Sequence, residues 1–278
     1  MSLATPPNGA YWDDIAIAVG QHDPSATWRA YMQAAYRDLL TRWFAGTHPG
    51  PTLKTDLFEE AVTPHHLFHD LGTQGIGLDV SPGVVHSAAR RLSLDASVRS
   101  APLLVADLRH VPLADGCLQR ILSGSSLDHF EHKRDIAVAL AELERCLAPG
   151  GVLVVTFDNP HNPVVRLRNG LPFRWMAAVK LVPYFVGATY TRTEVRRTLT
   201  ALGLRITDES AIVHVPRAPA IWISVLRERL GRRGVSATLL RLFRTWDRLE
   251  STVLRYRTGY YLAVRVEKPP GETGHEHA

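Results

Sequence analysis

Short apolar runs alternate with helical stretches through the middle of the chain. Between residues 51 and 159 the apolar runs are "PTLKTD", "GIGLDV", "PLLVAD", "LQRILSGS" and "VLVVTF". Among the intervening stretches, the clearest helical stripe consists of Ile136, Leu140, Leu143 and Leu147. Strands that alternate with helices favour a parallel sheet covered on both faces, which is an α/β fold.

Local signals predict where several helices begin and end. Ser81 can cap a helix that has Pro82 at its first position, and "APGG" stops the helix that precedes it. Residues 27–44 have the apolar recurrence of an amphipathic helix. In "EEAVTPHHLFHDL", Pro64 is expected to break or offset the helix.

The pattern changes after residue 160. "TRTEVRRTLTALG" predicts a capped helix that ends at Gly203, and "LRITDESAIVHV" and "GYYLAVRVEK" predict two further strands. Between those strands lies a helical insertion at 217–257. The predicted domains are a helical lid at 1–50, a main domain at 51–268 that includes this insertion, and a flexible tail at 269–278.

Polar residues stand at the carboxyl end of each predicted strand, where open α/β sheets bind ligands. Asp79 closes the second strand and Asp107 the third, and "SGSSLDHF" and "FDNPHNP" follow the fourth and fifth. Asp79 comes 23 residues after Asp56. This is near the spacing of ~20 residues at which an acid accepts hydrogen bonds from the ribose of a nucleotide.

Three of these segments together are similar to a known family. "GIGLDVSPGVVHSAARR", "LLVADLRHVPLADGCLQRILSGSSLDHF" and "ALAELERCLAPGGVLVVTF" resemble the core motifs of class I S-adenosylmethionine-dependent methyltransferases. The resemblance covers about 53–159, weakens afterwards, and does not include the N-terminal helix or the insertion. It implies a Rossmann-like fold with a mostly parallel seven-stranded sheet and an antiparallel last strand. The implied activity is methyl transfer from S-adenosylmethionine to oxygen or nitrogen of a small molecule.

The resemblance also implies residues that contact the cofactor. Asp79, followed by Val80, matches the acid that binds the ribose hydroxyls. Asp107 matches the polar residue beside the adenine amino group, with Leu108 against the ring. The backbone of "SG", which is Ser123 and Gly124, matches the stretch near the methionine portion.

The first motif departs from the family, which usually has an acid followed by a glycine-rich turn. Here Lys54 stands at the place of the acid, and Asp56, Phe58 and Glu60 stand at the places of the glycines. One hypothesis is that side chains bind the cofactor: Lys54 would pair with its carboxylate, and Asp56 or Glu60 with its ammonium group. The alternative is that this loop has lost the cofactor and the domain no longer methylates.

The candidate catalytic residues follow the fourth and fifth strands, which we expect to flank the first. A general base is needed when the acceptor is a hydroxyl or a protonated amine. The candidates are His129 with Asp128, and the cluster Asp158, Asn159 and His161. The alternatives are that Asp128 only caps a helix beside a half-exposed His129, and that "DNPHNP" is a loop stiffened by proline.

Other candidates have weaker support. Tyr184 and Tyr190 are expected either to line the pocket or to pack in a loop. The histidines of "HHLFH", His65, His66 and His69, have helical spacing but lack further ligands nearby, so no metal site is predicted.

Charge is concentrated in the insertion. Residues 217–257 contain ten arginines and three acids, so a net charge of +5 for the chain leaves the remainder slightly acidic. From 239 to 255 the leucines, Trp246 and Val253 are expected to face the core, and the arginines to face solvent. The alternative is that these arginines bind an anionic membrane or a phosphate-bearing substrate. Nucleic acid is not predicted, because aromatic and basic residues do not interleave.

The composition indicates the class of protein and where it is expected in the cell. With 45% hydrophobic residues and no apolar run of membrane-spanning length, the 278-residue chain is expected to be a cytoplasmic globular protein. Cys117 and Cys146 lack the spacing of a metal site. The alternative to a methyltransferase is a non-catalytic cofactor-binding or interaction protein on the same fold. A nicotinamide-dependent oxidoreductase is disfavoured, because it would need the glycine turn to bind a pyrophosphate.

Overall fold

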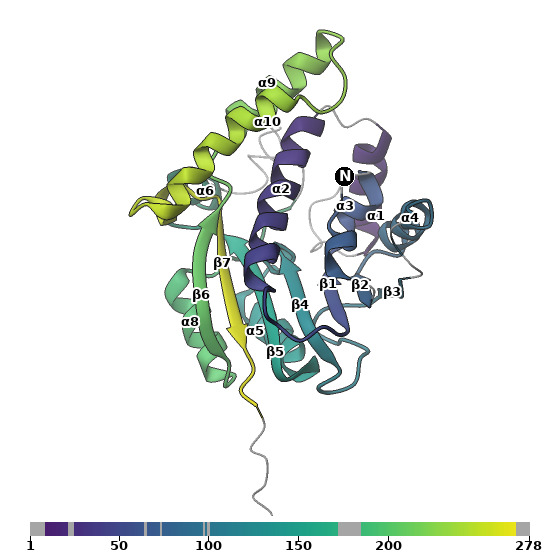
Figure 1. Cartoon of the computed structure of the whole chain (residues 1–278), viewed down its shortest axis with the longest axis vertical. Coiled ribbons are helices and arrows are strands. Elements are labelled where there is room, and N and C mark those ends of the chain that lie inside the picture. The colour runs from purple at the N-terminus through teal and green to yellow at the C-terminus, as the bar shows by residue number, and fades with distance from the viewer. Residues whose placement is uncertain are drawn as a thin grey trace, which may run out of the picture.

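The computed structural model describes residues 9–21, 25–63, 66–72, 74–96, 98, 101–171 and 185–270. A seven-stranded sheet runs through the molecule in the order β3-β2-β1-β4-β5-β7-β6 (Figure 1). The strands are β1 (Thr52–Thr55), β2 (Gly75–Asp79), β3 (Leu103–Val105), β4 (Leu118–Gly124), β5 (Leu147–Asp158), β6 (Arg205–Ile212) and β7 (Tyr261–Glu267).

The sheet is parallel except for β7. The pairs β1–β2, β1–β4, β2–β3 and β4–β5 are parallel, whereas β7 is antiparallel to both β5 and β6. This confirms the predicted α/β fold with its antiparallel last strand. One expectation about neighbours was wrong: β1 lies between β2 and β4, and β5 lies beyond β4. The strand order reverses at β1, and ligands bind beyond the carboxyl ends at such a switch point.

Helices cover both faces of the sheet and divide the core in two. On one face α2 (Ala26–Trp43), α3 (Phe58–Val62) and α4 (Pro82–Leu92) contribute to one cluster of buried apolar side chains. On the other face α5 (Lys133–Cys146) and α8 (Arg192–Ala201) contribute to a second cluster. The predicted stripe of α5 is buried, and Ile136, Leu140 and Leu143 are fully covered.

The predicted helix ends are confirmed where the structure describes them. The Ser81 hydroxyl accepts a hydrogen bond from the Val84 amide at 3.0 Å, with Pro82 in the first turn of α4. Thr191 and Glu194 form a reciprocal capping box at the start of α8. The helix before Pro64 ends at Val62, and a short 3-10 turn, η1 (Phe68–Leu71), follows.

The N-terminal region contains a helix that the pattern did not predict, α1 (Gly9–Gln21). Asp13 on α1 accepts hydrogen bonds from the Ser81 hydroxyl and, at 2.8 Å, from the Gly83 amide. These groups belong to the first turn of α4, whose backbone donors are otherwise unpaired within the helix. Asp13 therefore attaches α1 to the carboxyl edge of the sheet.

The insertion is helical, as predicted, but residues 239–255 do not form the one continuous helical face that their periodicity predicted. It comprises α9 (Arg217–Arg229), α10 (Ala237–Arg244), a 3-10 segment η3 (Thr245–Ser251) and α11 (Arg255–Thr258). Both α9 and α10 contact α2 (Figure 1). Because the α-helical period stops at Arg244, the expected core face breaks up: Val253 is 96% exposed, and Phe243 is buried instead.

Candidate functional site

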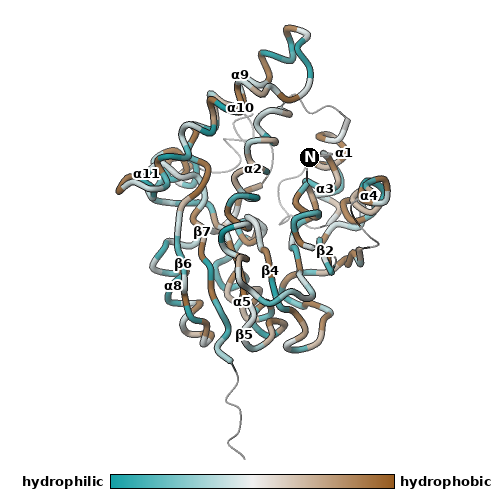
Figure 2. Tube along the Cα trace, in the orientation of Figure 1, coloured by the Kyte–Doolittle hydropathy of each residue, from teal (hydrophilic) through white to brown (hydrophobic). Residues whose placement is uncertain are grey.

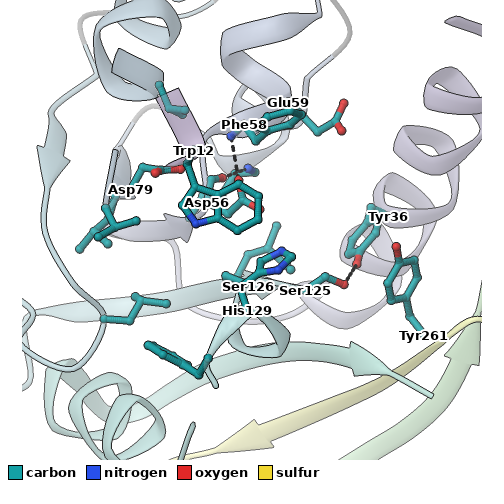
Figure 3. A pocket seen from close by; sticks show the side chains of 18 of the residues that line it. Trp12, Tyr36, Asp56, Phe58, Glu59, Asp79, Ser125, Ser126, His129 and Tyr261 are labelled. Atoms are coloured by element: carbon teal, nitrogen blue, oxygen red, sulfur yellow. Dashed lines mark hydrogen bonds between the residues drawn. The ribbon is translucent and has the colours of Figure 1, made fainter. Parts of the chain in front are cut away.

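A cavity of about 900 Å³ lies at the carboxyl ends of β1, β2 and β4. Helices α1, α2 and α9 supply the opposite wall, with Trp12, Met32 and Ile221 among the lining residues. Its volume is in the range of small-molecule and cofactor sites. Figure 3 shows Asp56, Asp79 and His129 around this space, with Trp12 of α1 over it.

Asp79 organises the loops around the cavity as well as lining it. Its two carboxylate oxygens accept hydrogen bonds from the backbone amides of Leu57, at 2.8 Å, and Ser81, at 2.9 Å. Burial, with the charge of Asp56 second, raises the pKa of Asp79 to about 7. The two amide hydrogen bonds act in the opposite direction. Further hydrogen bonds donated by a ligand would stabilise the charged form of this buried carboxylate.

Asp107 lines the same cavity from the loop after β3. It forms an ion pair with Arg109, with 2.6 Å between Nη2 and Oδ2. Partial burial acts to raise the pKa of Asp107, but the hydrogen bonds and charge of Arg109 outweigh it and lower the pKa overall. Leu108, which is buried, also lines the cavity. The two aspartates therefore face one space, as an adenosine site requires.

The first loop keeps a glycine-like backbone at one position only. Asp56 has a φ of 68°, in the left-handed region that favours glycine. Its Oδ1 accepts a hydrogen bond of 2.7 Å from the Phe58 amide, so the side chain of Asp56 stabilises the turn that its own backbone forms. Asp56 and Phe58 both line the cavity. The chain thus makes the family's turn without a glycine.

Lys54 and Glu60 are paired with each other. The Lys54 ammonium lies 2.8 Å from Glu60 Oε2 and also donates to the Asp56 carbonyl. Glu60 is fully buried and does not line the cavity, so its proposed pairing with a cofactor ammonium group was wrong. Burial acts to lower the pKa of Lys54, and the charge of Glu60 outweighs it and raises the pKa. Lys54 does line the cavity, but its charge is already neutralised.

The remaining cofactor candidates separate into cavity-lining and buried residues. Val80, which is 39% exposed, and Gly124 line the cavity. Ser123 is fully buried and does not line it. Its hydroxyl accepts from Thr55 at 3.0 Å and lies 3.0 Å from Ser126 Oγ, so it joins β1 to the segment after β4. A Cβ added to Gly124 would meet the Tyr36 ring at 3.4 Å.

His129 lines the cavity and has a defined tautomer. Its Nδ1 lies 3.0 Å from the Phe185 carbonyl oxygen. A carbonyl oxygen only accepts, so Nδ1 carries the proton and Nε2 carries the lone pair of the neutral ring. Trp12 packs against the imidazole, with 4.5 Å between ring centroids. Burial lowers the pKa of His129, which keeps the ring neutral and able to accept a proton at neutral pH.

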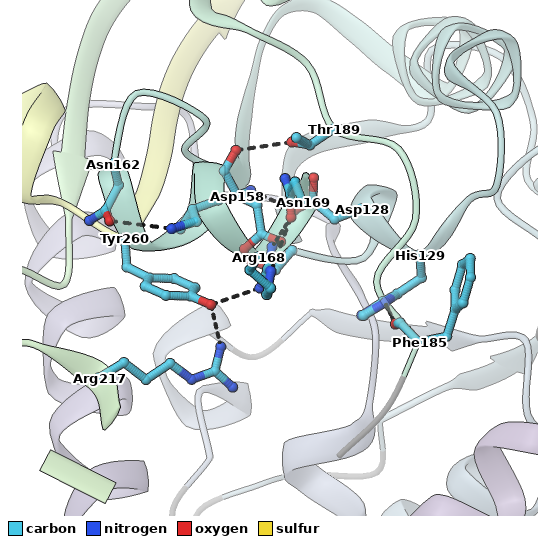
Figure 4. A network of polar contacts seen from close by, with 12 residues as sticks. Asp128, His129, Asp158, Asn162, Arg168, Asn169, Phe185, Thr189, Arg217 and Tyr260 are labelled. Atoms are coloured by element: carbon cyan, nitrogen blue, oxygen red, sulfur yellow. Dashed lines mark hydrogen bonds and ion pairs between the residues drawn. The ribbon is translucent and has the colours of Figure 1, made fainter. Parts of the chain in front are cut away.

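Asp128 and Asp158 do not line the cavity and form a buried network behind it (Figure 4). Asp128 Oδ2 accepts a hydrogen bond of 2.7 Å from the Asp158 amide, and the Asp158 carboxylate pairs with Arg168. Arg168 and Arg217 both donate to the Tyr260 hydroxyl, at 2.7 and 2.9 Å. Burial, with the charge of Asp158 second, raises the pKa of Asp128 well above its usual range. The prediction that these acids act on the acceptor was wrong.

The "DNPHNP" loop has the structural role that the alternative described. Asn159 is fully buried and donates through Nδ2 to the carbonyls of Tyr256 and Gly259. Asn162 caps α6 (Pro163–Asn169). His161 is exposed and lies outside the cavity lining, so its assignment as a catalytic residue was also wrong.

Two other candidates, Tyr190 and His66, do not line the cavity. Tyr190 is buried and donates to the Lys133 carbonyl at 2.9 Å, a packing role away from the cavity lining. His66 Nε2 lies 3.3 Å from Asp95 Oδ2. Tyr184 and His65 lie outside the described residues.

The sequence analysis missed the wall that the helices supply. Arg29 of α2 pairs with Glu59 across the cavity rim, at 2.5 Å, and both residues line it. Tyr36 of α2 lies 2.8 Å from the Thr156 hydroxyl. Arg217 of α9 lies over the Trp28 ring, 6.0 Å from its centroid. No motif marks Arg29, Tyr36 and Arg217, because α2 and α9 lie outside the segments that resemble the family.

Comparison with known proteins agrees with this geometry. Residues 62–155 match the family described as a methyltransferase domain. The matched segment is about a third of the chain, and it coincides with most of the stretch that resembles the class I S-adenosylmethionine-dependent methyltransferases. A curated relative, an uncharacterised 37.1 kDa protein in transposon TN4556 of Streptomyces fradiae, is 28% identical over 234 residues. The match covers 75% of this chain and 62% of the length of that relative.

Solved structures share the fold of this chain at low identity. The [4+2]-cyclase SpnF has a TM-score of 0.59 at 17% identity, with 95% of each chain covered. Geranyl diphosphate C-methyltransferase from Streptomyces coelicolor A3(2) has a TM-score of 0.57 at 15% identity, with 96% of this chain and all of that chain covered. That structure contains S-adenosyl-L-homocysteine. A possible histamine N-methyltransferase from Thermotoga maritima has a TM-score of 0.57 at 13% identity, covering 92% of this chain and 99% of that one.

Proposed function

We propose that this protein transfers a methyl group from S-adenosylmethionine to an oxygen or nitrogen of a small-molecule acceptor. One observation carries the proposal: Asp79, Asp107 and His129 line a single cavity at the switch point of the sheet. The first two suit adenosine, and the third suits removal of a proton from an acceptor. The volume of about 900 Å³ is ample for more than one small ligand.

Each wall has a separate task in this proposal. Asp79 accepts hydrogen bonds from the ribose hydroxyls, and Asp107 with Leu108 holds the adenine. Asp56, in the turn after β1, would face the ammonium group of the cofactor. When bound, S-adenosylmethionine supplies a methyl group on a positively charged sulfur. His129 accepts the proton of the acceptor at Nε2, while Trp12 and α2 exclude water from the cavity.

The second candidate is a non-catalytic protein that binds the cofactor or a related ligand. The buried pair between Lys54 and Glu60 favours it, because Glu60 neutralises the charge of Lys54 without a ligand. The family fold also serves other reactions, since SpnF is described as a [4+2]-cyclase. Binding and transfer must therefore be measured separately.

Two measurements on the same preparation separate the candidates. Purified protein is incubated with methyl-labelled S-adenosylmethionine and a panel of small hydroxyl- and amine-bearing compounds, and labelled products are detected by mass spectrometry. Binding of S-adenosylhomocysteine is measured in parallel. Labelled product with wild type and its loss in Asp79→Ala support methyl transfer. Binding without any labelled product across the panel supports the non-catalytic alternative.

A further inference from the structure

The insertion directs its arginines outward and its acids inward. Six arginines of the insertion are exposed and form no ion pair with a described residue: Arg229, Arg232, Arg233, Arg241, Arg248 and Arg257. Asp247 instead accepts from the Tyr31 hydroxyl at 2.5 Å, and Glu250 pairs with Arg42 at 2.8 Å. The third acid, Glu228, is half-buried. The six exposed arginines therefore give the outer surface a strong positive charge.

Large apolar side chains lie on the same outer surface. On α9, Trp222, Leu226 and Leu230 are 64%, 39% and 70% exposed. They follow one another at intervals of four residues, so they form one stripe along the helix. The next segment adds three more exposed apolar residues: Leu242, Trp246 and Val253. Figure 2 shows hydrophobic segments along α9 and α10 and just before α11, at the edge of the molecule.

The fold does not need these exposed residues to attach the insertion. Ala220 and Ser224 are the buried residues of α9, and Phe243 is the buried residue of α10. Phe243 packs against Tyr31 of α2, with 5.9 Å between the ring centroids. The inner faces of α9 and α10 are thus already packed on the core. The outer tryptophans and leucines remain exposed to water, which is unfavourable for apolar side chains.

We propose that this outer face, formed by the six exposed arginines and the exposed apolar side chains of 222–253, binds to the surface of an anionic lipid bilayer. Tryptophan and leucine enter the boundary between headgroups and acyl chains, and arginine contacts lipid phosphates with its planar donors. Among the described residues, no helix combines the length and the hydropathy of a membrane span. A second copy of the chain is a poor partner for this face. The insertion has a net charge of +7, ten arginines less three acids, so the insertions of two copies would repel each other.

The location of this surface adds a consequence for access to the cavity. Helix α9 presents Trp222 outward, while Arg217 and Ile221 of the same helix line the cavity. Bilayer binding therefore places one wall of the cavity next to the membrane. The binding itself does not depend on methyl transfer and is tested without any acceptor.

The test is sedimentation of the full chain with vesicles made of equal parts phosphatidylcholine and phosphatidylglycerol, against vesicles of phosphatidylcholine alone. Each arginine near an anionic surface contributes about fivefold to partitioning. We expect Arg229→Gln with Arg233→Gln to reduce binding by about 20-fold, and Trp222→Ser with Leu230→Ser by about tenfold or more. Higher salt reduces binding of the wild type.

Matched controls lie on a different part of the surface. Arg90 is exposed, and Leu94 is 85% exposed, so Arg90→Gln and Leu94→Ser remove the same kinds of side chain elsewhere. These controls should bind as the wild type does. Equal binding to both vesicle types, no binding, or equal effects of control and test variants would overturn the proposal. So would gel filtration that shows a dimer lost in Trp222→Ser, because the face would then be an interface between copies.

Discussion

The two walls of the cavity are built in different ways. The sheet wall carries Asp79, Asp107 and Gly124 directly after parallel strands, so the strand register fixes their positions. The helix wall carries Trp12 of α1 and Arg217 of α9, whose positions depend on side-chain contacts across long sequence distances. The positions of the sheet-wall residues are therefore encoded locally, whereas those of the helix-wall residues depend on tertiary packing.

A second difference lies within the sheet wall. Asp79 stands where the resemblance predicts the ribose-binding acid, while the loop after β1 has a buried ion pair between Lys54 and Glu60 where the resemblance predicts a glycine turn. The left-handed φ of Asp56 shows that the turn persists although its chemistry has changed. The predictions below separate residues that hold the wall together from residues that contact ligands.

The largest expected effect is on stability, from breaking the buried pair. Lys54→Met leaves the fully buried Glu60 carboxylate uncompensated, so the free energy of unfolding should fall by about 3–5 kcal/mol. Urea denaturation measures it. The double variant Lys54→Met with Glu60→Leu should recover most of the loss. If Lys54→Met unfolds like the wild type but no longer binds S-adenosylhomocysteine, Lys54 contacts the cofactor directly.

The next effect is on turnover. His129→Gln removes the proton acceptor and should reduce turnover by about 100-fold, while His161→Gln on the surface should change nothing. Because burial lowers the pKa of His129 below its usual 6.5, turnover of the wild type should be flat above pH 7 and fall only at more acidic pH. An unchanged pH profile in His129→Gln would remove the base assignment.

A smaller effect is expected on cofactor affinity. Asp79→Asn weakens the hydrogen bonds to the ribose, by about 2 kcal/mol or roughly 30-fold in affinity. Hydroxyl donors favour the charged carboxylate, so binding should release a proton when Asp79 is still partly protonated. Since the pKa of Asp79 is raised to about 7, wild-type affinity for S-adenosylhomocysteine should rise with pH up to about 7 and level off above it.

The control for that measurement is Asp115→Asn, because Asp115 is exposed and pairs with Arg145 away from the cavity. Its affinity and pH dependence should match the wild type. Asp79→Asn should show no pH dependence over the same range. A similar pH dependence in both variants would assign the proton to another group.

The smallest effect concerns the attachment of α1. Asp13→Ala removes the acceptor for Ser81 and Gly83 at the start of α4, at a cost of about 1 kcal/mol. Hydrogen exchange in residues 9–21 should become faster, and cofactor affinity should fall only a few-fold. Asp14→Ala, one position along the same helix, is the matched control. Equal exchange in both variants would show that α1 is held by other contacts.

The sequence predicted most of the sheet wall and little of the helix wall. Alternating strands and helices identified the sheet, and Asp79 and Asp107 line one cavity because parallel strands end at one edge. Trp12 was missed because α1 is short and only weakly amphipathic. Asp128 and Asp158 were misassigned because spacing along the chain cannot show that a carboxylate points behind the cavity, toward Arg168.

The insertion shows a related limit. Its leucine and tryptophan period suggested a face packed on the core, whereas the helix ends at Arg244, and Phe243, with Leu239 and Leu240 partly buried beside it, packs on the core. A periodic pattern predicts an amphipathic helix but does not say which surface covers it.

The central claim is that this cavity binds the adenosine cofactor although its first loop lacks glycine. Calorimetric titration of the wild type with S-adenosylhomocysteine tests it most directly. The account predicts saturable heat with one ligand per chain, and a clear loss of affinity in Asp79→Asn. Absence of heat from protein that is folded by circular dichroism would contradict it.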